Sequence, residues 1–326
     1  MNDINIVRYK VSNYGEWNQF VAKAKNATFL FHRDFMDYHK DRFHDFSLLV
    51  YKKNKLIAVL PANVLNEDLY SHQGLTYGGL VLKEQIKFDA VLRVFMELLK
   101  YLSIAGFKSL VLKQMPVIYT RVFTAEIDYL MFILKADLFR KDTLSVIDLA
   151  TNRVNISSNR LEGCRRAIKH NLVVKEEGDF ELFWDSILIK NLKEKHNAKP
   201  VHSLEEITLL KKCFPNNIRQ FNVYDNDEIV AGTTVFETEF VAHSQYISGN
   251  ENNNAKGSLD FLHHYLIKEI FKDKMYFDFG TSNENNGLNI NKGLQFWKEG
   301  FGSRTVTQDF YKINVNNYHL LNNVFI

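Results

Sequence analysis

The alternation of apolar and polar residues predicts the same group of elements twice along the chain. Residues 46–65 and residues 219–238 each contain two apolar-rich stretches separated by a short polar turn, which is the pattern of a β-hairpin. Val50-Tyr51 in the first hairpin matches Val223-Tyr224 in the second, an offset of 173 residues (from 50 to 223). A match this short could arise by chance, so the order of the following elements decides whether the repeat is real.

That order is also repeated, because each hairpin is followed by a strand, an apolar-faced helix and a further strand. The first half has a strand ending near 77–80, a helix at 89–104 and a strand at 109–112; the second half has them at 240–248, 258–271 and 275–279. Hairpin, strand, helix and strand, twice, predict an α/β fold with two mixed sheets, each flanked by helices. We place the boundary between 149 and 158, which gives domains of residues 1–150 and 151–326.

Composition limits the classes of function. The length of 326 residues favours two domains of ordinary size, and a hydrophobic content of 46% excludes a disordered chain. The 41 Lys and Arg residues nearly balance 38 Asp and Glu, so no broad field attracts nucleic acid or a membrane surface. The N-terminus lacks the pattern of a signal peptide, and no apolar run approaches the length of a membrane span. We expect a soluble, cytoplasmic protein.

Cysteine and histidine give no sign of a metal site. Cys164 and Cys213 are the only cysteines, and they lie far apart without the spacing of metal ligands. His263 and His264 are adjacent on a predicted helix, so they point to different faces, and no zinc-binding pattern surrounds them. We therefore expect neither a bound metal nor a covalent cysteine intermediate.

A polar loop between strand 240–248 and the helix at 258 has the features of a phosphate site. The loop contains Asn253, Lys256 and Gly257 and leads to Ser258 at the helix start. Unpaired backbone N–H groups and the helix dipole favour an anion there, and glycine allows close approach. The alternative is an ordinary loop with a serine cap. The corresponding stretch of the first half, residues 81–88, contains no glycine and predicts no such site.

A second candidate region follows strand 275–279, since ligands of open α/β sheets bind at the carboxyl ends of strands. Asp278, Ser282 and Glu284 are the polar side chains that such a ligand would meet. We interpret Asp278 as a buried partner for neighbouring backbone. For Glu284 a functional and a structural interpretation both remain open.

At these residues the sequence resembles a known family, the tandem-GNAT (Fem-like) N-acyltransferases. The resemblance rests on Tyr276–Glu284, Gly287, Gly293-Leu294 and Lys298–Gly302, with further similarity in Pro200–His202, His243–Tyr246, Leu259-Asp260, Arg33–His39 and Tyr77–Leu80. Within that family the chain looks most like enzymes that acylate nucleotide-linked amino sugars for O-antigen, lipopolysaccharide or capsule precursors. The resemblance covers most of the chain.

The resemblance implies that acyl-coenzyme A is the co-substrate and that it binds the second half. The pantetheine arm would pair with strand 240–248 and the pyrophosphate would lie on 253–258, although this loop has fewer glycines than the usual GNAT phosphate loop. The implied coenzyme A contacts are Tyr246, Ser248, Asn253, Lys256, Gly257, Ser258, Asn291 and Phe296. Gly257→Val is expected to weaken coenzyme A binding and leave the fold intact. The first half is expected to be a degenerate GNAT-like domain that helps form an acceptor cleft.

The expected acceptor is the amine of a dTDP- or UDP-linked amino sugar. The predicted acceptor contacts are Tyr77, Arg160, Arg166, His202, Ser282 and Lys292. Arginine suits a diphosphate because its guanidinium binds bidentately, but Arg160 and Arg166 also fit the solvated face of a helix. His202 lies in a polar connection that is either an acceptor loop or a turn before a helix.

Amines are protonated in water, so acyl transfer to an amine needs a base. Glu284 is the first candidate and His243 the second, with backbone N–H groups of strand 240–248 stabilising the developing oxyanion. Two rival functions remain: a Fem-type aminoacyltransferase acting on peptidoglycan precursors, and a non-catalytic GNAT-fold binding module. A monomer is expected, because two GNAT-like domains in one chain can mimic a GNAT dimer.

Overall fold

The computed structural model of the chain describes residues 3–151 and 154–326. The chain forms two compact units. Unit 1 comprises Met1–Asp142 together with Thr307–Ile326, and unit 2 comprises Thr143–Val306.

These limits differ from the boundary predicted at 150/151. Strand β9 (Asp137–Asp148) begins in unit 1 and ends in unit 2, and the last strand, β17 (Arg304–Asn314), returns the chain to unit 1. Residues 152 and 153 of the expected linker lie outside the described residues. A chain that leaves and re-enters a unit cannot be recognised from a composition shift at one point.

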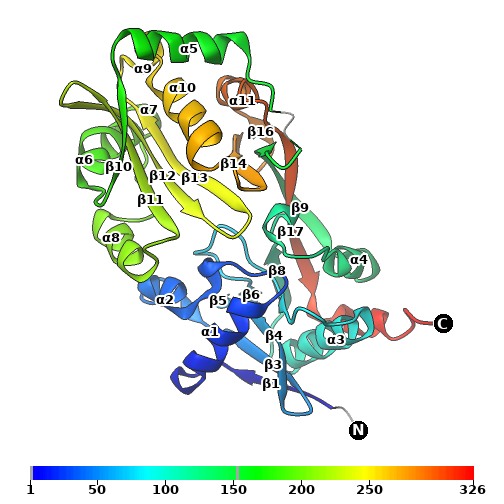
Figure 1. Cartoon of the computed structure of the whole chain (residues 1–326). Coiled ribbons are helices and arrows are strands. Elements are labelled where there is room, and N and C mark those ends of the chain that lie inside the picture. The colour runs from blue at the N-terminus through cyan, green and yellow to red at the C-terminus, as the bar shows by residue number, and fades with distance from the viewer. Residues whose placement is uncertain (1–2, 152–153) are drawn as a thin grey trace. The chain divides into compact units, whose positions relative to one another are not determined.

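Unit 2 is built on one mixed sheet (Figure 1). The strands follow the order β10 (Val173–Glu177), β11 (Ile218–Asp225), β12 (Glu228–Glu237), β13 (Val241–Gly249), β14 (Tyr276–Thr281) and the end of β9. Neighbours are antiparallel except β13 and β14, which are parallel and joined by a helical crossover. The mixed sheet predicted for the second half is confirmed.

Helices cover both faces of this sheet. The helices are α5 (Ser158–Lys169), α6 (Glu181–Phe183), α7 (Ile189–His196), α8 (Leu204–Cys213), α9 (Asn253–Lys256), α10 (Ser258–Tyr265) and α11 (Lys292–Glu299), with π-helical turns at Trp184–Leu188 and Leu266–Ile270. Ala231 of β12 packs in the core that contains Leu262 of α10, whereas a Cβ on the next residue, Gly232, would lie 2.5 Å from Phe183 of α6. Adjacent strand residues point to opposite faces, so α10 and α6 cover opposite sides of the sheet.

Unit 1 has two sheets. One has the order β1 (Ile4–Arg8), β3 (Leu48–Lys52), β4 (Lys55–Leu60) and β7 (Val81–Leu82); the other contains β17, β8 (Ser109–Lys113), β6 (Asp68–Tyr70), β5 (Asn63–Leu65) and β2 (His44–Asp45). The helices are α1 (Tyr14–Lys23), α2 (Arg33–Met36), α3 (Phe88–Ile104) and α4 (Glu126–Ile133). Phe95 and Leu98 of α3 share a buried core with Leu60 and Leu110, one from each sheet. Within residues 3–151 and 154–326, no helix is both long enough and apolar enough to cross a membrane.

The internal repeat predicted from the hairpins is present in the structure. The β3–β4 pairing shifts register between Val50 and Tyr51, and the β11–β12 pairing shifts between Val223 and Tyr224, at matching positions. One difference from the prediction concerns the strand expected to end near 77–80: residues 71–80 leave the sheet between β6 and β7. The fold class predicted from the sequence, an α/β chain of two repeated sheet-and-helix units, is confirmed.

Candidate active site

The candidate site of unit 2 lies where β13 and β14 separate. The two strands pair from Val241 and Tyr276 to His243 and Asp278 and then diverge. Beyond this fork, β13 continues against β12 to Gly249, while β14 pairs with β9. The side of β13 that faced β14 is therefore a strand edge, which can bind an extended ligand through backbone hydrogen bonds.

A β-bulge lies in β13 just past the fork. The β12–β13 register shifts between Thr234 and Val235, so that Gln245 is the extra residue on β13. A bulge re-aims the side chains that follow it and is frequent beside active sites. The side-chain oxygen Oε1 of Gln245 is buried, and no described residue forms a hydrogen bond with it. The bulge therefore leaves a buried acceptor beside the strand edge.

A histidine–carboxylate pair occupies the fork. Nδ1 of His243 lies 2.9 Å from Oδ2 of Asp278, and the Asp278 side chain is 1% exposed. The second oxygen, Oδ1, accepts a hydrogen bond of 2.7 Å from the Gly280 backbone N–H. A carboxylate only accepts, so the ring proton of neutral His243 resides on Nδ1 and Nε2 keeps its lone pair. The His243 side chain is 11% exposed, and because Nδ1 is bonded to Asp278, Nε2 is the ring nitrogen left for a substrate.

Hydrogen bonds fix the end of β14 next to this pair. Gly280 has φ +68°, and a Cβ there would lie 3.1 Å from Cε1 of His243. The ammonium of Lys298, on α11, donates to the carbonyl oxygens of Gly280 at 3.1 Å and Thr281 at 2.7 Å. Burial lowers the pKa of Lys298 to about 8, although the nearby Asp278 carboxylate acts in the opposite direction.

The lowered pKa of Lys298 predicts a pH-dependent stability. Between pH 8 and the unperturbed pKa near 10.5, the unfolded chain binds more protons at this residue than the folded chain, so unfolding becomes harder as pH rises. Relative to Lys298→Met, the free energy of unfolding of the unaltered protein should rise by about 1–3 kcal/mol over this window. Urea unfolding at pH 7 to 10 measures it. Other buried groups titrate in both proteins and cancel, so parallel stability curves would contradict the prediction.

The structure brings His202 and Tyr246 together on the same face as His243. Nδ1 of His202 lies 2.6 Å from the Tyr246 hydroxyl. The ring centroid of His202 lies 6.1 Å from that of Phe236. Phe236 on β12 is paired directly with His243 on β13, and directly paired residues lie on the same face of a sheet. Trp184 contacts the Tyr246 ring edge-on at 5.1 Å. Two residues predicted separately, one for the acceptor and one for coenzyme A, are thus direct partners.

The loop expected to hold phosphate is engaged in contacts of its own. Lys256 forms an ion pair with Asp225, and the Leu259 N–H donates to Oδ1 of Asn253 at 2.9 Å. Ser258, at the start of α10, is fully buried, and no described residue bonds its hydroxyl. A phosphate here would compete with Asp225 for the lysine, so the phosphate role of 253–258 stays a prediction.

The surroundings of Gly257 argue against the expectation that Gly257→Val leaves the fold intact. Gly257 has φ +74°, and a Cβ there would lie 2.1 Å from the backbone oxygen of Gly163 in α5. The absence of a side chain at Gly257 thus permits contact between two segments of the protein itself.

Both arginines predicted to meet a diphosphate have partners within unit 2. Arg160 Nη1 donates to Oδ1 of Asp260 at 2.6 Å, and Nε1 of Trp297 donates to the same oxygen at 2.9 Å. Arg166 donates to the backbone oxygens of Ala255 at 3.0 Å and Asn254 at 3.2 Å. In these positions Arg160 joins α5 to α10 and α11, and Arg166 fixes the loop before α10. These hydrogen bonds use one donor group of Arg160 and two of Arg166, so the diphosphate role of both arginines stays a prediction.

Glu284 lies on a surface hairpin formed by β15 (Asn283–Glu284) and β16 (Asn289–Ile290). It is exposed, and its Oε1 accepts a hydrogen bond of 3.0 Å from the side chain of Asn291. Asn291 also caps α11 by accepting from the Leu294 N–H at 3.0 Å. Glu284 and Asn291 are therefore brought together, on a hairpin outside the strand fork.

The remaining predicted residues have varied surroundings. Ser248 accepts a hydrogen bond of 2.8 Å from Asn191, and Ser282 is buried with no described partner for its hydroxyl. Lys292 and Phe296 are exposed on α11. Tyr77 is buried in unit 1, where its hydroxyl lies 2.9 Å from that of Thr28.

Sequence reasoning missed the side-chain partner of His243. Asp278 was interpreted as a partner for backbone; it does accept the Gly280 N–H, but its other oxygen holds the imidazole. Lys298 was noted only as part of the family resemblance. One signal in the sequence could have found the pair. His243 and Asp278 are each the third residue of their strand, so a parallel pairing of the two strands from their first residues places them opposite each other. In the described part of the chain, no cluster of three or more His, Cys, Asp or Glu has the arrangement of a metal site.

Comparison with known proteins supports the fold. No protein-family model matches the chain, and no curated protein matches it. Among solved structures, FemX is similar with a TM-score of 0.67 at 10% identity, covering 97% of this chain and 99% of that chain. A tandem GNAT protein from the clavulanic acid biosynthesis pathway gives a TM-score of 0.54 at 9% identity, with 96% and 98% covered. L-PGS from Bacillus licheniformis gives 0.54 at 14% identity, with 81% and 85% covered.

At such identities the similarity establishes the fold alone. The chain has the fold of tandem GNAT proteins, as the sequence predicted.

Proposed function

We propose that this protein is an N-acyltransferase that transfers an acyl group from acyl-coenzyme A to a primary amine, with His243 as the general base. The observation that carries the proposal is the pair of His243 and Asp278, 2.9 Å apart at the point where β13 and β14 separate. In an α/β sheet such a fork is where a ligand can enter between strands.

The pair has the properties that a general base needs. An amine must lose a proton as it attacks a carbonyl carbon, and neutral imidazole accepts a proton near neutral pH. Asp278 fixes the tautomer with Nε2 unprotonated, and it stabilises the imidazolium that forms when Nε2 accepts a proton. The Gly280 N–H and the Lys298 ammonium hold the carboxylate and the strand end in place, so the ring does not have to be positioned during the reaction.

Acyl-coenzyme A would supply a thioester, whose carbonyl is more readily attacked than that of an ester or amide. The free edge of β13 past His243 suits the amide-rich pantetheine arm, because backbone N–H and C=O groups there have no second strand to pair with. Ser258, with its unpartnered hydroxyl at the start of α10, is the residue of the 253–258 loop best suited to a phosphate.

For the acceptor we favour the amine of a dTDP- or UDP-linked amino sugar. This choice rests on the sequence resemblance and on the hydrogen-bonding pair of His202 and Tyr246, which shares a sheet face with His243. A Fem-type aminoacyltransferase is the second candidate, because the TM-score to FemX, 0.67 over 97% of the chain, exceeds the 0.54 to the clavulanic acid pathway protein.

Release of free thiol tests the function directly. The purified chain is incubated with a series of acyl-coenzyme A donors and dTDP- or UDP-amino sugars, and parallel reactions contain aminoacyl-tRNA with a peptidoglycan precursor. Thiol release that requires an amino sugar supports the proposal. Aminoacyl transfer without thiol release supports the Fem-type alternative, and inactivity of both reactions across the series supports a binding module.

Glu284→Gln separates the two predicted bases. Because Glu284 is exposed and already accepts a hydrogen bond from Asn291, we expect the substitution to lower turnover less than about threefold. A loss on the order of 10²–10⁴ with donor KM nearly unchanged would instead identify Glu284 as the base. Steady-state kinetics of thiol release provide both values.

A further inference from the structure

Unit 1 contains a counterpart of the strand fork of unit 2. In unit 1, β6 and β8 are parallel and pair over three positions, as β13 and β14 do in unit 2. The pairs are Asp68–Ser109, Leu69–Leu110 and Tyr70–Val111 in unit 1, and Val241–Tyr276, Ala242–Phe277 and His243–Asp278 in unit 2. The first strands keep the 173-residue offset of the hairpins (from 68 to 241), so the two forks are equivalent positions of the repeat.

The two forks carry different side chains. The positions of His243 and Asp278 correspond to Tyr70 and Val111 in unit 1, which cannot form a base and its carboxylate partner. The residue offset between the two units falls to 167 at the second strand of each fork (from 109 to 276). It falls because the segment after the first strand, residues 71–80 in unit 1, is longer than the corresponding bulged segment of β13. Unit 1 therefore has no counterpart of the His243–Asp278 pair at its fork and has a longer loop at the same place.

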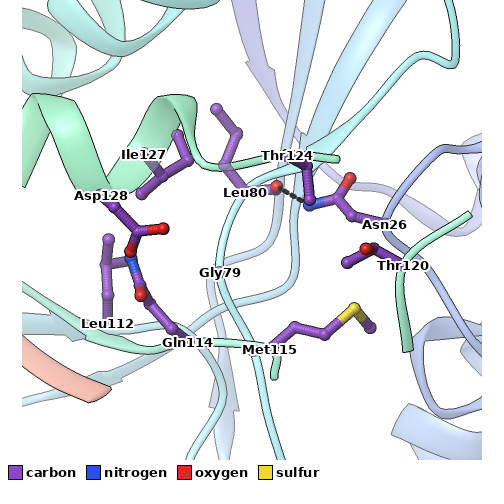
Figure 2. Close-up of a pocket in the computed structure, with 11 residues that line it drawn as sticks. Asn26, Gly79, Leu80, Leu112, Gln114, Met115, Thr120, Thr124, Ile127 and Asp128 are labelled. Atoms are coloured by element: carbon purple, nitrogen blue, oxygen red, sulfur yellow. Dashed lines mark hydrogen bonds between the residues drawn. The ribbon is translucent and has the colours of Figure 1, made fainter. Parts of the chain in front are cut away.

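A pocket opens at that loop. A single parallel bridge joins Gly78 to Gln114, with the Gly78 N–H donating to the Lys113 oxygen at 2.6 Å. Beyond the bridge, Gly79 and Leu80 line a pocket that opens to solvent (Figure 2). Gly79 has φ +103°, and no atom lies within 4 Å of the position of a Cβ, so this part of the wall is open.

The polar groups of the pocket differ in what they can offer a ligand. The side chain of Asn26 is already used: it donates to the Leu80 oxygen and accepts from the Leu82 N–H, both at 2.8 Å. In contrast, the Thr124 hydroxyl is buried, and no described residue bonds it. A buried hydroxyl without a partner costs free energy that a bound ligand would recover.

Charge decides which ligands suit the pocket. Asp128, whose carboxyl group faces the Gln114 amide in Figure 2, is the only charged residue of the lining. Burial raises the pKa of Asp128, although the hydrogen bond from Gln114 lowers it. Asp128 as a whole residue is exposed, and its carboxylate attracts a cation and repels an anion, so an ammonium group suits the pocket and a phosphate does not. The apolar side chains of Leu80 and Ile127 also line the pocket, where they can pack against a small carbon skeleton.

We propose that this pocket of unit 1 binds a small amine that carries hydroxyl groups, with its ammonium on Asp128 and a hydroxyl on Thr124. The site goes beyond the acyl transfer proposed above and does not require it, since the pocket, Asp128 and Thr124 all belong to unit 1. Unit 1 would then bind the amine at its strand fork, whereas the equivalent fork of unit 2 would carry out acyl transfer.

Calorimetric titration of the full chain without any acyl donor tests the site. The probe is glucosamine, and N-acetylglucosamine is the matched ligand in which the amine is capped. We expect glucosamine to bind with a dissociation constant on the order of 1 mM, as a few contacts in an open pocket allow, and at least about tenfold more tightly than N-acetylglucosamine. Asp128→Asn, which keeps size and removes charge, should abolish this preference.

Two further variants complete the test. Thr124→Val keeps the shape of the side chain and should weaken glucosamine binding about three- to tenfold. Asp41→Asn, at an exposed acid of unit 1 outside the pocket, should leave binding unchanged. Equal affinity for both sugars, no saturable binding by the unaltered protein, or unaltered binding in Asp128→Asn would overturn the proposal. A thermal unfolding curve of each variant confirms that it is folded.

Discussion

Replacement of His243 by glutamine is expected to lower turnover by a factor on the order of 10²–10⁴ while the KM for the acyl donor changes little. Glutamine is close to histidine in size and can still donate to Oδ2 of Asp278, so the strand fork should keep its structure. An amide cannot accept the amine proton, and the lost rate is therefore the contribution of the base. The measurement is kcat and KM from thiol release, with circular dichroism as the check on folding.

Asp278→Asn is the companion experiment. The asparagine amide would donate to Nδ1 of His243, which would place the ring proton on Nε2 and leave no acceptor for the amine. If the two residues act as one unit, the double variant should be no slower than the slower single variant, because effects within a catalytic unit are not additive. Full turnover in His243→Gln would show that His243 is not the base, and full turnover in both His243→Gln and Glu284→Gln would show that the enzyme binds its amine in the neutral form.

The local parts of the fold could be predicted because they depend on short-range pattern. The hairpins around residues 46–65 and 219–238 have alternating apolar residues and polar turns, and the structure contains both as β3–β4 and β11–β12. Helix α3 was expected at 89–104 and spans Phe88–Ile104, since its apolar face follows the helical period.

Features that depend on distant pairing could not be predicted. Strand β17 returns the chain to unit 1 by pairing with β8, about two hundred residues earlier in the sequence, and nothing in either strand specifies the other. The fork has the same character. His243 was a candidate from its strand alone, but its contact with Asp278 depends on the parallel pairing of β13 with β14 across a helical crossover.

The pocket of unit 1 escaped prediction for a related reason. Residues 71–80 looked like the approach to an ordinary strand, whereas the structure holds them out of the sheet and uses Gly78 as a single bridge to Gln114. The lining comes from segments around residues 26, 79, 114 and 124, none of which carries a recognisable motif. The matching strand pairings of the two repeats show that this site follows the position equivalent to the fork of unit 2.

Gly257→Val is expected to destabilise the protein by about 2–5 kcal/mol, the sum of a strained left-handed backbone and an overpacked contact. Gly257 has φ +74°, which a β-branched residue rarely adopts, and its Cβ would lie 2.1 Å from the Gly163 oxygen and 2.8 Å from the Gly163 Cα. These are backbone atoms of α5, which cannot turn aside as a flexible side chain can. Gly163 is itself confined, because a Cβ there would lie 1.9 Å from Oδ2 of Asp260.

Thermal and urea unfolding measure this loss, and two control variants separate its causes. Gly257→Asn adds a Cβ but tolerates the left-handed conformation, so its loss reports mainly the contact with α5. Gly178→Val, in unit 2, places its Cβ where no atom lies within 4 Å and should change stability by less than about 1 kcal/mol.

If Gly257→Val unfolds like the unaltered protein but binds coenzyme A more weakly, the glycine serves a phosphate rather than α5. If stability falls as expected, affinity measured on this variant says nothing about phosphate, and Ser258→Ala becomes the variant that tests the loop, since Ser258 has a buried hydroxyl without a described partner.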